Sequence, residues 1–262
     1  MAEKSNIEIE LAKQAGPIFE KGYDDLLHPS VESIGTTISF LPRTIRLWLG
    51  KWEKWIINGE ESIRLTAEAV REKAKEIPDE KLSEPEPYVA IPVIQQLSYC
   101  YDSEELREMY ANLLVSSMNI DTKNYVHPAF AEIIKQLTPD EAKLIKKIST
   151  NDDYPLIDIR INVPSGGFQT KLHNFTNISE GVCENPNGIL SYLENFIRLG
   201  LITIPTFLYL TDEKVYYPLE QHPLVQNILN QKLPEGYSYE ISKGEFRITP
   251  FGRDFINTCI IP

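Results

Sequence analysis

Three helix starts follow one another within residues 102–149, and this segment constrains the fold more than any other part of the chain. Asp102 and Glu105 match the D-x-x-E capping pattern, which satisfies two free backbone amides at the start of a helix. His127-Pro128 places a proline at the first helical position, where it is tolerated. The run TPDE at 138–141 combines a cap, a proline and two acids at the positive end of a helix dipole. The segment therefore predicts three consecutive helices.

The apolar residues of these helices recur every three or four positions, so each helix should turn one face toward a core. The predicted inward residues of the first two helices are Leu106, Met109, Tyr110, Leu113 and Ser117, followed by Phe130, Ile133, Ile134 and Leu137. Capping accounts for the acids, the histidine and the prolines at the helix starts. The segment thus predicts a rigid helical hub and offers no obvious catalytic residue.

A tryptophan stripe precedes this hub, and we treat it as the candidate interaction surface. Its members, spaced four, three, four and three residues apart, are Leu41, Ile45, Trp48, Trp52 and Trp55. The pattern resumes in a second stretch up to Ile77, and Pro78 ends it. One interpretation packs the stripe against other helices or a second copy of the chain. The other places a basic, aromatic helix in a membrane interface.

Residues 78–92 contain four prolines and four acids, which predicts an extended linker with a helix starting at Pro92. Beyond the hub, the apolar residues within 156–163 favour a short strand or an extended arm. Ser165-Gly166-Gly167 lacks the lysine of a phosphate loop, so we predict a turn there. Asn185 to Gly188 is a second break, and it precedes the last unit of the chain.

Residues 189–262 show the order helix, strand, strand, helix. The first helix should end at Gly200, the strands should cover 201–204 and 237–248, and the last helix should start at Thr249-Pro250. With an inserted helix at 222–232, this order is typical of a winged-helix unit. The wing strands carry Lys214, Lys243 and Arg247 against Glu235, Glu240 and Glu245, and the candidate recognition helix carries one arginine and one glutamate. We therefore expect a structural or protein-binding wing rather than a DNA reader.

Composition supports the same expectation. The chain has 262 residues, a formal net charge of −12 and a pI near 4.9, which disfavours general affinity for nucleic-acid phosphate. Its three cysteines are far apart, so they predict neither a disulfide framework nor a zinc site. The N-terminal residues lack the apolar core of a signal peptide, and no run of about 18 apolar residues could span a membrane.

Candidate catalytic residues are scarce. Three of the four histidines, at 28, 127 and 222, directly precede a proline, which is the context of a cap or turn rather than of a metal ligand. There is no G-x-S-x-G nucleophile elbow. We therefore predict no enzyme, no catalytic residue, no cofactor, no metal and no small-molecule ligand.

Three long runs of the sequence are distinctive. They begin at Tyr88 (YVAIPVIQQLSYCYDSEELREMYANLLVSSMN), at Val126 (VHPAFAEIIKQLTPDEAKLI) and at Ile248 (ITPFGRDFINTCI). These runs resemble the abortive-infection alpha family of bacterial proteins. The resemblance runs in order across roughly 78–262, and YDDLL at 23–27 looks like part of the family's more variable lead-in. It implies a link to phage defence, but it implies no known reaction and assigns no active-site residue.

From these observations we predict a mainly α protein with a smaller α+β part. An amphipathic helical region should cover 1–77, a central helical bundle 78–150 and a winged-helix-like domain 151–262. The expected function is non-catalytic defence through protein–protein contacts, with a protein partner or a homo-oligomer. The alternatives are a membrane-active toxin that uses the tryptophan stripe and a nucleic-acid-binding regulator that uses the wing. A cytoplasmic protein is expected, with a membrane surface as the second location that the stripe allows.

Overall fold

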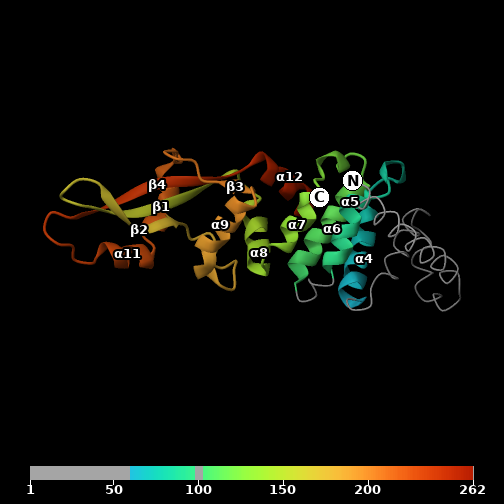
Figure 1. The fold of residues 1–262 in the computed structure, drawn as a ribbon, viewed down its shortest axis with the longest axis horizontal. Helices are drawn as coiled ribbons and strands as arrows, with labels where there is room; N and C mark the ends of the chain where they lie inside the picture. The colour runs from blue at the N-terminus through green and yellow to red at the C-terminus, as the bar shows by residue number, and fades with distance from the viewer. Residues whose placement is uncertain (1–59, 98–102, 262) are drawn as a thin grey trace, which may run out of the picture.

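The computed structural model describes residues 60–97 and 103–261, and only the backbone of residues 60–64. Nine α-helices and a four-stranded antiparallel sheet form an α+β fold in these ranges. The molecule is elongated, with most helices at one end and the sheet at the other (Figure 1). The helices are α4 (Glu60–Ala74), α5 (Pro87–Leu97), α6 (Glu104–Met118), α7 (Ala129–Lys135), α8 (Pro139–Ile148), α9 (Ile189–Arg198), α10 (Tyr217–Glu220), α11 (Pro223–Leu229) and α12 (Pro250–Cys259).

Helix α6 lies at the centre of the helical end. It contacts α4, α5, α7, α8 and α12, and from Tyr110 to Met118 every side chain is buried. The predicted inward faces are confirmed, because all nine residues that we assigned to the first two helices are buried. A helix that is covered on all sides acts as a core element rather than as a surface helix. Helix α6 is therefore the central helix of this end of the molecule, and the classification as a helical bundle stays a prediction.

The three predicted helices are present, and each starts within one residue of its predicted position. Thr138 and Glu141 form a complete capping box, in which the Glu141 amide donates to Thr138 Oγ1 and the Thr138 amide donates to the Glu141 carboxylate. The capping box predicted for Asp102 and Glu105 is wrong. Ser103 is the N-cap instead, with extended backbone angles that aim its hydroxyl oxygen at the Leu106 amide.

Helix α7 begins one residue later than predicted, at Ala129, with Pro128 as its N-cap. His127 supplies the missing cap, because its Nδ1 accepts a hydrogen bond of 3.1 Å from the Ala129 amide. His127 lies exposed at this helix start, and its ring contacts those of Phe130 and Phe251. A capping role therefore explains this histidine, as the sequence pattern indicated.

The linker predicted for residues 78–92 is shorter than expected. Helix α5 begins at Pro87, five residues before the predicted start, and Pro92 lies inside it. Pro87 takes the first-turn position, and the extended part that precedes it hydrogen-bonds to the end of α6 through the Ser83 amide and the Met118 carbonyl at 2.7 Å. A proline does start this helix, but it is Pro87 rather than Pro92.

The sheet joins strands that are far apart in the sequence. Its strands are β1 (Asp153–Asn162), β2 (Phe168–Phe175), β3 (Ile202–Thr203) and β4 (Ser238–Ile248), in the order β2-β1-β4-β3. Gly166 and Gly167 both have positive φ and form the turn between β1 and β2, as predicted. The sequence pattern did not predict β2, whose side chains are mostly exposed and therefore lack a clear alternation.

Helix α9, strands β3 and β4 and helix α12 follow in the predicted order. Gly200 has φ +74°, and the amides of Gly200 and Leu201 bond back to Ile197 and Phe196 as in a Schellman cap. β4 pairs with β1 along Asp153–Asn162 and with β3 at only two positions. The inserted helix α11 is shorter than predicted and is joined by α10. The winged-helix classification itself stays a prediction.

The larger hydrophobic core crosses from the helical end into the sheet. It includes residues of α6 and α7 together with Phe196, Phe246 and Phe255. A smaller cluster lies at the far end of the sheet, where Tyr216 is completely buried among residues of β1, β2, α10 and α11. The division at 77 and 150 stays a prediction. The tryptophan stripe, formed by Leu41, Ile45, Trp48, Trp52 and Trp55, lies outside the described residues.

Candidate functional site

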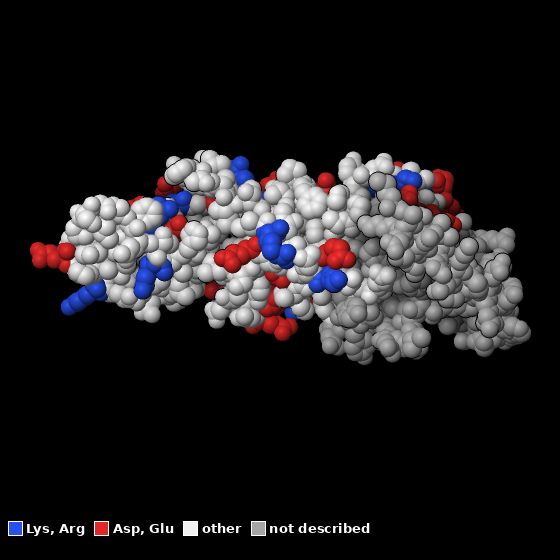
Figure 2. Space-filling view, viewed as in Figure 1, with Lys and Arg blue, Asp and Glu red and all other residues white. Residues whose placement is uncertain are grey.

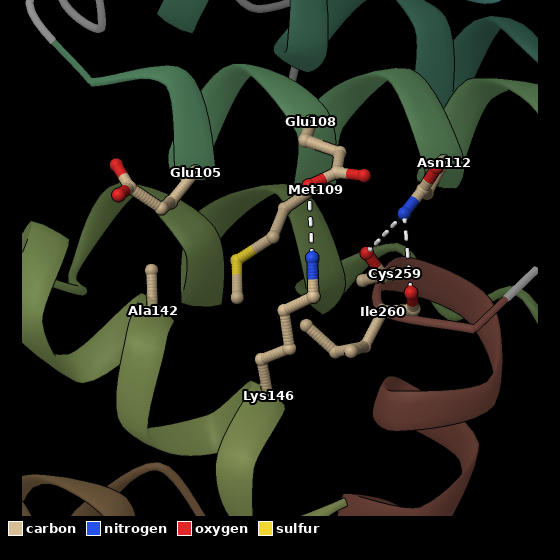
Figure 3. Close-up of a pocket in the computed structure, with 8 residues that line it drawn as sticks. All are labelled: Glu105, Glu108, Met109, Asn112, Ala142, Lys146, Cys259 and Ile260. Carbon is tan, nitrogen blue, oxygen red and sulfur yellow. Dashed lines mark hydrogen bonds and ion pairs between the residues drawn. The ribbon is translucent and has the colours of Figure 1, made fainter. Parts of the chain in front are cut away.

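A shallow pocket lies between α6, α8 and α12, and Figure 3 shows its lining. It has an empty volume of about 250 Å³, which includes space open to solvent. The lining residues are Glu105, Glu108, Met109, Asn112, Ala142, Lys146, Cys259 and Ile260. Two carboxylates and one ammonium group thus stand beside apolar side chains and a buried amide.

The charged groups of this pocket are held by one another. Lys146 Nζ lies 3.4 Å from Glu108 Oε2, and Lys73 Nζ lies 3.8 Å from Glu108 Oε1. Burial works against ionisation of Glu105, but its own amide, the Ser103 hydroxyl and Lys143 outweigh that effect and lower the pKa of the carboxyl. Glu105 is therefore a carboxylate at neutral pH, which makes it unsuited to donate a proton.

Asn112 closes one side of the pocket. Its Nδ2 donates to the carbonyl oxygens of Cys259 at 2.9 Å and Ile260 at 3.5 Å, so it satisfies acceptors that a helix end leaves free. Its Oδ1 is buried and has no hydrogen-bond partner among the described residues. In Figure 3 Nδ2 points toward the end of α12. The role of Asn112 is therefore to join two helices.

The chemistry of the pocket is limited. Cys259 is completely buried, which raises the pKa of its thiol well above the ordinary value, so its thiolate is disfavoured. Within residues 60–97 and 103–261, no group of three His, Cys, Asp or Glu residues is arranged to hold a metal ion. The pocket brings together an ion pair and helix-end hydrogen bonds, and this arrangement fits a structural seam.

A second polar cluster joins α8 to α9. The Asp140 carboxylate accepts hydrogen bonds from the amides of Glu184 and Asn185 and from the Tyr192 hydroxyl. Burial favours the neutral acid, but these bonds outweigh it and lower the pKa of Asp140. Burial and the Asp140 carboxylate raise the pKa of Tyr192 to about 12. Asp140, which we assigned to the helix dipole alone, therefore also fixes the loop before α9.

Two of the three predicted wing cations, Lys243 and Arg247, are paired with carboxylates. Lys243 Nζ lies 3.2 Å from Glu213 and 3.3 Å from Glu220, and Arg247 Nε lies 3.1 Å from Asp153. Arg198 on α9 bonds to Asn195 and Gln136. Figure 2 shows basic and acidic side chains interspersed on this face, without a broad basic area over the described residues. The described part of the face shown in Figure 2 therefore offers no cluster of cations of the kind that phosphate binding requires.

An exposed apolar loop leaves β3 at the sheet end, and we call residues 204–210 the Phe207 loop. Its tip, residues 206–209, is exposed, and Phe207 exposes 95% of its surface. Phe207 also has φ +64°, a left-handed backbone conformation that non-glycine residues rarely adopt. Both ends of the loop are held to β4. Thr203 pairs with Arg247, and the Leu210 amide donates to Tyr216, whose hydroxyl donates to the Gly244 carbonyl.

The sequence interpretation missed this loop. The run FLYL at 207–210 lies between a strand and the polar residues TDEK, and four apolar residues in such a connection were a usable signal. Lys243, one of the wing residues that the sequence pattern identified, lies close to the Phe207 loop, because it contacts Glu213 and the ring of Tyr216. The structure therefore brings the wing cations and the Phe207 loop to the same end of the sheet.

The described residues thus combine a helical core, an antiparallel sheet and an exposed apolar loop. The family model described as abortive infection alpha matches residues 58–259, so the chain belongs to the abortive infection alpha family. The predicted resemblance is thereby confirmed, and the match begins about 20 residues earlier than the resemblance indicated.

Other comparisons add little. No curated protein matches the chain significantly. The solved structure of an uncharacterized protein from the hydrocarbon-degrading marine bacterium Alcanivorax borkumensis SK2 aligns with 22% identity over 49% of this chain and 90% of that chain. Its TM-score of 0.30 is too low to establish a shared fold. Among the described helices, none combines the length and apolar character needed to cross a bilayer.

Proposed function

We propose that this chain is a non-catalytic protein of bacterial abortive infection that acts by binding a protein partner. The observation that carries the proposal is the Phe207 loop, whose tip exposes Phe207, Leu208 and Tyr209 together. Contiguous exposed apolar residues on a folded protein are typical of contact surfaces, and aromatic residues are the commonest energetic centres of such surfaces. Family membership supports the link to defence.

The nucleic-acid alternative has weaker support. Lys243, Arg247 and Arg198 are each engaged with carboxylate or amide groups, so binding DNA would require these bonds to be broken. The chain's formal net charge of −12 opposes phosphate as well. The tryptophan stripe remains a second predicted contact surface, for a partner, a second copy or a membrane.

The test is controlled expression in a bacterial host, with and without phage. We expect the wild type to limit phage yield or to arrest the infected cells. We expect the combined change Trp48→Ala, Trp52→Ala and Trp55→Ala to reduce this effect if the stripe takes part. Wild-type protein that leaves phage yield and host growth unchanged at confirmed expression would argue against a role in defence. Retarded DNA at physiological salt in a gel-shift assay would favour the regulator instead.

A further inference from the structure

The Phe207 loop is presented on a fixed base. Tyr216 is completely buried, and its hydroxyl accepts from the Leu210 amide at 2.8 Å while donating to the Gly244 carbonyl at 2.9 Å. The other end of the loop continues directly from β3, which pairs with the same strand, β4. A loop held at both ends by one strand loses little conformational freedom when it binds, and this favours affinity.

Phe207, at the tip of the loop, contributes little to the stability of the fold. Phe207 combines a left-handed backbone with 95% exposure, so it contributes neither a favourable local conformation nor buried apolar surface. Strained residues of this kind cluster at functional positions, where the strain fixes the direction of a side chain. The side chain is therefore positioned for a surface outside this protein.

The charged residues that follow the tip include more acids than bases. Asp212 and Glu213 follow it in the chain, and Glu220 lies close by because it shares Lys243 with Glu213. Lys243 and Lys214 offset part of this charge, but one negative charge remains in excess, and the formal charge of the chain is −12. An anionic bilayer would repel such a surface, whereas a basic protein surface would attract it.

We propose that residues 206–209 insert into an apolar pocket of a protein partner whose rim carries Lys or Arg. This inference rests on the proposed function and adds to it the chemistry of the partner and the residue at the centre of the contact. Phe207 fills the pocket, while Asp212 and Glu213 face the basic rim. The apolar part supplies affinity, and the charged rim speeds association and makes binding depend on salt.

The test begins with a photoreactive phenylalanine at position 207 of the full chain, expressed in phage-infected cells. The matched control carries the same group at Tyr125, an exposed aromatic residue at the helical end. The protein that crosslinks from position 207 is identified and purified, and its binding to the full chain is measured by calorimetry at low and at high salt. Vesicles of phosphatidylethanolamine and phosphatidylglycerol are tested in parallel.

We expect a protein adduct from position 207 and none from 125. Phe207→Ser should weaken binding at least about tenfold, and Tyr125→Ser should leave it unchanged. Asp212→Asn keeps an oxygen to cap the Lys214 amide but removes a charge, so it should weaken binding a few-fold and flatten the salt dependence. Asp121→Asn, which removes an exposed charge at the helical end, is the control.

Several results would overturn the inference. The crosslinking results that would do so are an adduct with lipid, an adduct with a second copy of this chain, or no adduct at position 207. The binding results that would do so are an affinity for the partner that Phe207→Ser leaves unchanged, or an affinity that rises with salt. Vesicle binding that is lost with Phe207→Ser would assign the loop to a membrane. A partner bound with unchanged affinity by the Phe207 variant would refute this inference and leave the proposed function standing. Absence of any phage phenotype in the wild type would instead refute the proposed function.

Discussion

Asn112 on α6 donates a hydrogen bond of 2.9 Å to the carbonyl oxygen of Cys259, so residues 147 positions apart fasten the central helix to the end of the chain. Ser116, one turn further along α6, bonds the Thr258 carbonyl in the same way. The last helix, which extends from the sheet, is thereby held against the helical hub. This contact is buried, and a buried polar group that loses its hydrogen-bond partner lowers the free energy of unfolding.

Asn112→Ala should lower the free energy of unfolding by roughly 1–3 kcal/mol, because two carbonyl oxygens lose their donor in a buried place. Asn112→Asp should be more harmful, since a carboxylate would face those oxygens. Urea denaturation followed by circular dichroism measures both. Ser116→Ala, which removes one hydroxyl bond, should cost about 1 kcal/mol. If Asn112→Ala were as stable as the wild type, the seam would not depend on this amide.

Gly252→Ala should destabilise the protein by roughly 3 kcal/mol, because overpacking against backbone cannot be relieved by a rotamer change. A Cβ at position 252 would lie 2.0 Å from the Leu201 carbonyl oxygen, which is itself held by the Thr249 amide at 3.0 Å. Gly244→Ala is the control, since its Cβ would meet Leu156 only at 4.0 Å. We expect that variant to stay within about 1 kcal/mol of the wild type. Thermal melts of the two variants should differ clearly, and equal melting temperatures would contradict the close approach.

Stability should fall as the pH rises from 10 toward 12. The pKa of Tyr192 is raised from 10.0 to about 12, first by burial and then by the Asp140 carboxylate. A pKa that is higher in the folded state means that the protonated hydroxyl stabilises the fold below pH 10, and that this contribution is lost through pH 12. Tyr192→Phe should remove this part of the pH dependence. The urea concentration at the unfolding midpoint, measured for both proteins at pH 8, 10 and 11, checks this prediction. If the midpoint fell equally with pH in the wild type and in Tyr192→Phe, Tyr192 would not be the source of the pH dependence.

Phe207→Gly should raise the free energy of unfolding by roughly 0.5–1 kcal/mol, because glycine adopts a positive φ without the steric cost that phenylalanine meets. The same change should abolish the contact proposed for the loop. Chemical denaturation measures the first effect. A loss of stability of more than about 1 kcal/mol would show that Phe207 makes a contact within the folded protein. Gain of stability with loss of binding would identify a residue kept for function.

Local rules predicted those parts of the fold that depend on near neighbours. The capping box of Thr138 and Glu141, the Gly200 helix end and the inward faces of α6 and α7 all follow from spacings of three to five residues, and a chain segment carries that information itself. The same rules failed where two similar signals competed. Ser103 and Asp102 are both residue types that cap helices well, and Pro87 and Pro92 are both prolines that could start a helix, so the local pattern alone could not decide between them.

The sequence by itself determined the helical hub, the order of elements in the last 74 residues and the family. Only the tertiary structure placed β1 beside β4, joined Asn112 to Cys259, and held the two ends of the Phe207 loop to one strand. These contacts join residues that are distant in the chain. A local hydrophobic pattern shows which residues are buried, but it does not show which distant residues they contact. The exposed tip needed the structure for the same reason, because an apolar run identifies a contact surface only when nothing in the fold covers it.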